Sequence, residues 1–121
     1  MRSKRARLRS QADELWYKKY LKPACEICGK KYVLQGHHFF YKSQYGHLRY
    51  DPENHITLCH RCHFLLHHKD PKLLTDHIIK LRGNEWYEAL KNKAQQNPRS
   101  YLNVKYYEDI INQLKVATLK K

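Results

Sequence analysis

The chain has 121 residues, with 24 Lys and Arg against 11 Asp and Glu, and its formal net charge is +13 with the histidines neutral. One domain is expected at this length, and a multidomain enzyme with a separate cofactor-binding fold is excluded. No apolar run approaches the roughly 18 residues of a membrane span. The charge predicts a polyanionic partner, with nucleic acid ahead of a membrane surface.

Five of the first ten residues are Arg or Lys, and no apolar stretch follows them as in a secretory signal. We therefore expect a reducing, cytoplasmic environment. Residues 1–9 are interpreted as a basic arm, either mobile or the exposed start of a helix. Ser10 to Asp13 resembles a capping box, and Leu15 and Trp16 follow at helical spacing. A helix is predicted over residues 10–22.

The residue pattern changes from helical to β-prone between residues 25 and 58, where glycines and Pro52 separate short β-prone segments. The clearest pieces are Lys31–Leu34 and His55–Leu58. We predict a short strand at each.

Beyond this region the chain reads as helical. A short helix is predicted at His63–His68, and an apolar stripe from Leu73 to Leu81 predicts another that ends at Gly83. Two more are expected around Trp86–Leu90 and Tyr107–Leu114, with Ser100 near the start of the last. We interpret residues 71–121 as a helical extension of one domain spanning residues 1–121, with apolar stripes that face its core.

The four cysteines form two C-x-x-C pairs separated by thirty residues: Cys25 with Cys28, and Cys59 with Cys62. Zinc takes four thiolates in a tetrahedron, and each pair can turn the chain tightly enough to offer two of them. The alternative, buried or redox-active thiols, does not explain two matching pairs. A closed four-sulfur site predicts a structural Zn²⁺.

Eight of the nine histidines lie between residues 37 and 68. His37 and His38 are adjacent at the end of a β-like piece, so their side chains should point to opposite faces and perform different tasks. His63 and His67 are four residues apart in a predicted helix and can chelate one ion. The ordinary alternative for any one of them is a solvated or packing histidine.

Together, these residues resemble the HNH, or ββα-metal, endonucleases, in the subgroup with two C-x-x-C knuckles. The resemblance covers about residues 25–68. Gly36-His37-His38 resembles the first-strand motif, Asn54 the middle asparagine, and His63 the metal ligand after the second knuckle. His67 matches the additional helix histidine of some members. Many members have Asp where this chain has His37, and imidazole favours Mn²⁺, Co²⁺, Ni²⁺ or Zn²⁺ over Mg²⁺.

The resemblance implies an α+β fold in which a small ββα-metal core (residues 25–68) with a structural zinc clamp is flanked by an N-terminal helix and two or three C-terminal helices. It implies a divalent-metal-dependent endonuclease that leaves 5′-phosphate and 3′-hydroxyl ends. His37, His63 and His67 would hold one catalytic ion (Mn²⁺, Mg²⁺, Ni²⁺, Co²⁺ or Zn²⁺). His38 would be the general base, and Asn54 would tie the second strand to the loop after His38.

Basic residues of the N-terminal arm and others close in sequence to the proposed centre are the expected DNA contacts. Such phosphate contacts position a protein without reading sequence. They are Arg2, Lys4, Arg5, Arg7, Arg9, Lys42, Arg49 and Arg61. A charge run is otherwise a solvated face.

Two function classes compete: a DNA endonuclease and a non-catalytic zinc-ribbon nucleic-acid-binding module. The histidines and Asn54 favour the nuclease, since a binding module needs none of them in that register. The flanking helices loosely resemble phage recombination endonucleases of the NinG type, and phage nucleases that act in genome packaging fit equally. The expected partners are duplex or branched DNA and phage packaging or recombination proteins, with the host cytoplasm as the compartment. A monomer is expected, with a dimer as the alternative.

Overall fold

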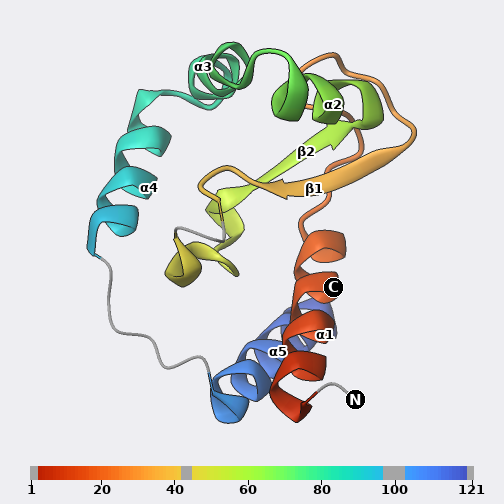
Figure 1. Ribbon diagram of the computed structural model, residues 1–121, viewed down its shortest axis with the longest axis vertical. Helices are drawn as coiled ribbons and strands as arrows, with labels where there is room; N and C mark the ends of the chain where they lie inside the picture. The colour runs from red at the N-terminus through yellow and green to blue at the C-terminus, as the bar shows by residue number, and fades with distance from the viewer. Residues whose placement is uncertain (1–2, 42–44, 97–102, 120–121) are drawn as a thin grey trace.

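The computed structural model describes residues 3–41, 45–96 and 103–119, without the side chains of residues 46, 66–68 and 116–119. Figure 1 shows a two-stranded hairpin surrounded by helices. In chain order the elements are α1 (Lys4–Lys19), β1 (Leu34–His38), the 3₁₀ turns η1 (Gly46–Leu48) and η2 (Pro52–Asn54), β2 (His55–Cys59), α2 (His60–His68), α3 (Pro71–Arg82), α4 (Asn84–Gln96) and α5 (Val104–Leu119). The predicted α+β architecture is confirmed.

Helix α1 begins six residues earlier than predicted. Ser3 is its N-cap and accepts a hydrogen bond from the amide of Ala6 at 3.1 Å. The basic residues from Lys4 onward are therefore helical, so the second interpretation of the basic segment is the correct one. Helix α3 starts and ends as the sequence predicts, with Asp70 capping its first turn and Gly83 at φ 101° closing its last.

The hairpin pairs β1 with β2 in antiparallel register, so that His37 lies opposite Ile56 and His38 opposite His55. Opposed residues share a face of a sheet, and successive residues alternate between faces. Gly36 lies on the same face as His38 and His55. A Cβ atom there would lie 2.4 Å from Nε2 of His55, so only glycine lets that ring pack against the strand.

One face of the hairpin packs against α2 and α3. Its core contains the strand residues Ile56 and Leu58 with Leu74 and Ile78 from α3, all 6% exposed or less. Leu74 and Ile78 of the predicted stripe therefore serve packing, as expected of an amphipathic helix. Leu73 and Leu81, at the two ends of the stripe, are instead 64% and 57% exposed, so the stripe that faces the core is narrower than predicted.

The other face packs against α1, which is itself covered by α5. Trp16 and Ala12 of α1 are fully buried with Tyr107 and Ile111 of α5. Figure 1 shows α5 lying beside α1, and Lys19 Nζ donates to the carbonyl of Leu114 at 3.1 Å. The hairpin thus separates two compartments that hold different parts of the chain.

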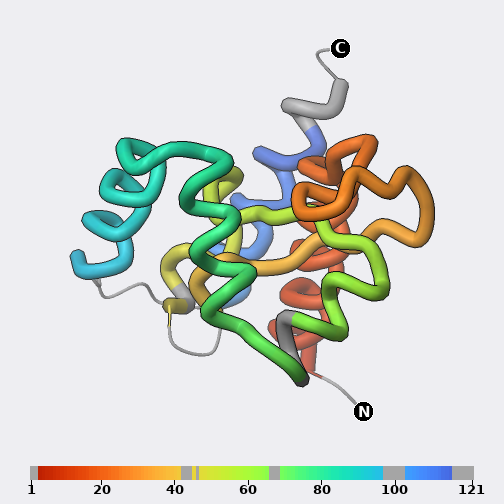
Figure 2. The backbone as a smooth tube through the Cα atoms, turned by 90° about the horizontal axis from the view of Figure 1, so that it is seen from above, coloured from red at the N-terminus to blue at the C-terminus, as the bar shows by residue number. Residues whose placement is uncertain are grey.

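Helix α4 covers the loop between the strands. Leu90 and Ala94 bury Leu48, and His47 Nε2 donates to the carbonyl of Lys93 at 2.9 Å. Trp86 Nε1 donates to the carbonyl of Glu53 at 3.1 Å. Both views place α4 well away from α1 (Figures 1 and 2).

The prediction of the first strand was wrong in position. Lys31–Leu34 is extended only at its last residue, because Val33 has φ 54° and breaks the strand geometry before Leu34. The short helix was predicted three residues late, since α2 begins at His60. Ser100 lies outside the described residues. Among the described helices, none is both long and apolar enough to cross a membrane.

Candidate zinc site and active site

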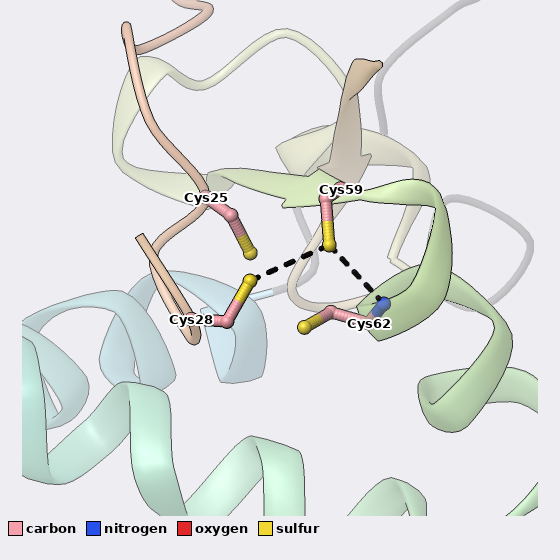
Figure 3. Close-up of side chains that lie close together, drawn as sticks. All are labelled: Cys25, Cys28, Cys59 and Cys62. Carbon is pink, nitrogen blue, oxygen red and sulfur yellow. Dashed lines mark hydrogen bonds between the residues drawn. The ribbon is translucent and has the colours of Figure 1, made fainter. Parts of the chain in front are cut away.

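The four cysteines converge from three parts of the fold. Cys25 and Cys28 lie in the loop before β1, Cys59 ends β2, and Cys62 lies in the first turn of α2. Their Sγ atoms all lie within 4.8 Å of one another, and Figure 3 shows them turned toward a common centre. A tetrahedron with Zn–S bonds of about 2.3 Å has S···S edges of about 3.8 Å. The 3.6 Å between Sγ of Cys28 and Sγ of Cys59 is close to this edge, so the four residues fit a zinc ion.

The first knuckle has the backbone conformation that the ligand pair needs. Gly29 has φ 79°, and its amide donates to the carbonyl of Cys25 at 2.9 Å. Burial raises the pKa of the Cys25 thiol, but hydrogen bonds from the backbone of Cys28, Cys59 and Ile27 outweigh it and lower the pKa to about 7. Burial and the neighbouring thiols raise the pKa of Cys62.

Glu26 connects the first knuckle to β2. Its amide donates to the carbonyl of Thr57 at 2.9 Å and its carboxylate accepts from the Thr57 amide at 2.7 Å. Arg82 of α3 forms an ion pair with the Glu26 carboxylate at 2.7 Å. Burial alone would raise the pKa of Glu26, but the Thr57 amide and Arg82 lower it. The knuckle, the second strand and α3 therefore form one connected unit.

His37 and His63 lie together on the α2 face of the hairpin. Their ring centroids are 3.9 Å apart with an interplanar angle of 31°. One ring comes from β1 and the other from the first turns of α2, and both are half-buried. Two imidazoles this close can serve one transition-metal ion as ligands. His67 lies one helical turn beyond His63 in α2, and its side chain is outside the described part of the structure.

His38 lies on the opposite face from His37, as alternation along a strand requires. It is 8% exposed, and its ring stacks on Trp16 of α1 with centroids 4.2 Å apart and planes 10° apart. Nε2 lies 2.9 Å from the carbonyl oxygen of Arg49, and Nδ1 lies 3.4 Å from the hydroxyl of Tyr17. The two adjacent histidines therefore occupy different environments.

Asn54 is fully buried and makes the tie that the sequence led us to expect. Its Oδ1 accepts from the amide of Phe40 at 2.7 Å, and its Nδ2 donates to the carbonyls of Phe40 and Leu48 at 3.1 and 3.2 Å. Its own carbonyl accepts from the amide of Phe39. Asn54 thus fixes the backbone that follows His38, and its contribution to catalysis stays a prediction.

The predicted DNA contacts fall into three groups. Lys4, Arg5, Arg7 and Arg9 lie in the first turns of α1, and Arg61 is exposed on α2. Arg2 and Lys42 lie outside the described residues. Arg49 is only 15% exposed and forms a bidentate ion pair with Asp13, with distances of 2.8 and 2.6 Å, and its contact with DNA stays a prediction. That pairing raises the pKa of Arg49 and fixes its guanidinium inside the fold.

Sequence reasoning missed the contribution of α1 to this region. Asp13, Trp16 and Tyr17 reach the His38 environment from a helix to which the sequence analysis assigned no role at the site. Their spacing within little more than one turn was visible, but nothing in the sequence indicates which strand face such a helix covers.

Comparison with known proteins gives one family match. Residues 25–69 match the family described as HNH endonuclease, which confirms the resemblance over a little more than a third of the chain. The match includes both cysteine pairs, His37, His38, Asn54 and His63. No curated protein and no solved structure matches the chain.

Proposed function

We propose, from the HNH endonuclease segment at residues 25–69, that this protein is a divalent-metal-dependent endonuclease that hydrolyses phosphodiester bonds of DNA. The observation that carries the proposal is the contact of His37 with His63, 3.9 Å apart between β1 and α2 inside that segment. The net charge of +13 supports a polyanionic substrate.

His37 and His63 are the proposed ligands of the catalytic ion, with His67 as a third from the same helix. When bound, such an ion acts as a Lewis acid at the scissile phosphate and the leaving 3′ oxygen. An all-imidazole set favours Mn²⁺, Co²⁺, Ni²⁺ or Zn²⁺ over Mg²⁺. The cysteine site, closed by four thiolates, is proposed to hold a separate structural Zn²⁺.

His38 is the proposed general base. Nε2 must carry hydrogen because its partner, the Arg49 carbonyl, can only accept, so the neutral ring keeps its lone pair on Nδ1. Nδ1 takes a proton from water as the water oxygen forms the new P–O bond and the P–O3′ bond breaks, and the leaving 3′ oxygen takes a proton from a solvent water molecule. Asn54 acts as a positioning residue by fixing the backbone after His38.

A second candidate is a zinc-ribbon module that binds nucleic acid without cutting it. The burial of His38, with a partner at each ring nitrogen, favours this alternative because a structural histidine looks the same. The two candidates differ in what adjacent substitutions do.

The test is cleavage of supercoiled, linear and four-way-junction DNA across a panel of Mn²⁺, Mg²⁺, Ni²⁺, Co²⁺ and Zn²⁺. His38→Ala should keep DNA binding but lose about 10²–10⁴-fold in rate, the usual contribution of a positioned base, with no recovery at higher metal concentration. His37→Ala and His63→Ala should recover part of the rate as the metal concentration rises. His77→Ala, an exposed histidine on α3, is the matched control.

If DNA binds but no metal supports cleavage, the protein is the binding module. If His38→Ala is rescued by metal and His37→Ala is not, the two roles are reversed. Preference for the four-way junction would support a role in phage recombination, and preference for duplex DNA a role in packaging.

A further inference from the structure

We infer that helix α1 positions the imidazole of His38 for catalysis, acting through Asp13, Trp16 and Tyr17. This inference rests on the proposed role of His38 as the base. All three residues lie outside the matched segment of residues 25–69, so the family match assigns them nothing.

The plane of the imidazole is set by Trp16. The two rings are stacked at 4.2 Å and 10°, and Trp16 is itself fully buried. Its Nε1 donates to the carbonyl of Asp51 at 3.2 Å, which ties the indole to the loop before β2. Stacking on a fixed indole opposes rotation of the imidazole about its Cβ–Cγ bond, because that rotation would break the face-to-face contact.

The direction of Nε2 is set by Asp13 through Arg49. The backbone carbonyl of Arg49 accepts from Nε2 of His38 at 2.9 Å. The guanidinium of the same residue donates to both carboxylate oxygens of Asp13. The hydroxyl of Tyr50 also donates to Asp13 at 2.9 Å. Asp13 therefore holds two consecutive residues of the loop, and with them the acceptor of the His38 proton.

The lone pair on Nδ1 faces Tyr17. Because Nδ1 carries no hydrogen in this tautomer, the Tyr17 hydroxyl is the donor across the 3.4 Å contact. This distance is long for an O–H···N bond, so a reacting water can replace the hydroxyl without losing a strong interaction. The Arg49 carbonyl thus sets the tautomer of His38, and the Tyr17 hydroxyl adds to that preference by facing the Nδ1 lone pair.

Helix α1 supplies matched controls for both side chains. Tyr20 also packs edge-on against Trp16, at 6.5 Å compared with 5.2 Å for Tyr17, and has a pKa raised by burial as Tyr17 does. Glu14 is adjacent to Asp13 but pairs with the exposed Lys18. Tyr20→Phe and Glu14→Gln therefore remove the same atoms or the same charge without touching the His38 environment.

The kinetic experiment measures kcat and KM for plasmid cleavage at saturating metal, with zinc content and thermal unfolding as checks on folding. Tyr17→Phe and Asp13→Asn should each lower kcat by about 10-fold or more, with KM changed less than about twofold, because orientation of a base affects the transition state and not DNA binding. Tyr20→Phe and Glu14→Gln should match wild type. Equal kcat in Tyr17→Phe and Tyr20→Phe, in a wild-type protein that cleaves, overturns the inference and leaves the proposed function standing.

A second readout does not depend on cleavage. Long-range ¹H–¹⁵N correlation spectra of the zinc-loaded full chain at pH 8 should show His38 as the Nε2–H tautomer, with its Nδ1 resonance shifted by Tyr17→Phe and not by Tyr20→Phe. An Nδ1–H tautomer, or an Nδ1 resonance unmoved by Tyr17→Phe, overturns the inference. If the wild-type protein cuts no DNA with any metal, the proposed function fails, and these spectra alone decide whether α1 positions the ring.

Discussion

His55 is a buried titratable residue that the proposed reaction does not use. It is 2% exposed, and its Nε2 donates to the carbonyl of Tyr17 at 3.0 Å. Burial lowers its pKa, although the Tyr17 carbonyl and Glu26 act in the opposite direction. The folded protein therefore resists protonation of a group that the unfolded chain protonates near pH 6.5.

The sign of the resulting pH dependence follows from linkage. Below about pH 6.5 the unfolded chain binds a proton at His55 that the folded protein does not. The free energy of unfolding therefore decreases as the pH is lowered, by up to about 1.4 kcal/mol per pH unit, until the pKa of the folded protein is reached. Urea unfolding of zinc-loaded protein between pH 5.5 and 7.5 should show a shallower dependence in His55→Gln, which keeps a donor for the Tyr17 carbonyl. Identical pH slopes in the two proteins would contradict this account.

At the scale of elements, the first turns of α1 combine a good cap with unfavourable charges. Ser3 caps the helix, yet the first turn carries no acidic residue, and the helix starts with Lys4 and Arg5. Cations at a helix N-terminus oppose the helix dipole, at a cost of a few tenths of a kcal/mol each. Figure 1 places this end of α1 far from α2, so phosphate contacts made there would lie well away from the proposed catalytic histidines.

The double variant Lys4→Gln/Arg5→Gln should weaken DNA binding and reduce the slope of log K against log salt by about 1.8 on duplex DNA, because each lost phosphate contact removes about 0.9. Its thermal stability should not fall, since the helix dipole is relieved. The control with the same charge loss is Lys18→Gln/Lys105→Gln, whose lysines each pair with an acid one turn away. Equal salt slopes in the two double variants would exclude this end of α1 from the DNA interface.

Elements were predictable where a local signal marks both ends. Helix α3 has Asp70 with Pro71 at its start and Gly83 at its end, and its bounds were predicted closely. The start of α1 was missed because Ser10 offers a second plausible cap inside a longer helix. The first strand was misplaced because Val33 adopts a left-handed φ that a β-branched residue rarely takes, and nothing in the local sequence signals it.

At the scale of the whole molecule, the cysteine site connects the loop before β1 to β2 and α2, and its cysteines pack against α3. Purified protein should contain one tightly bound zinc per chain, and chelation should unfold most of the residue 25–69 region, because a core this small depends on such a metal. Metal analysis and circular dichroism before and after chelation measure both effects. Zinc should restore the structure and Mg²⁺ should not, since thiolates bind Mg²⁺ poorly. A metal-free chain with an unchanged spectrum would contradict the clamp.

The candidate site divides in the same way into a predictable and an unpredictable part. The cysteines, His37, His38, Asn54 and His63 carry their chemistry in residue type and spacing. The structure brings the four cysteines together and places His37 against His63, with His38 on the other face of the hairpin, and the catalytic roles of these residues stay predictions. The partners of His38 come instead from tertiary packing of α1, which depends on α5 covering its outer side. The ion pair of Arg49 could not be predicted for the same reason, because its partner Asp13 lies 36 residues away in the chain.

The register of the hairpin gives the cysteine site a further consequence. A strand has only two faces, so the assignment of His37 to one compartment and His38 to the other is a matter of odd and even positions, and sliding β1 by one residue exchanges them. Cys59 pairs with Leu34 at the end of the hairpin that lies away from the two histidines. A zinc ion shared with the other three cysteines would fix Cys59 in place. A change that shifts the register of β1 by one residue would keep every residue of the site but exchange the two faces. His37, the proposed ligand, would then face Trp16, and His38, the proposed base, would face His63. Zinc bound at the Cys59 end of the hairpin would therefore fix which of the two histidines faces α1 and which faces α2 at the other end.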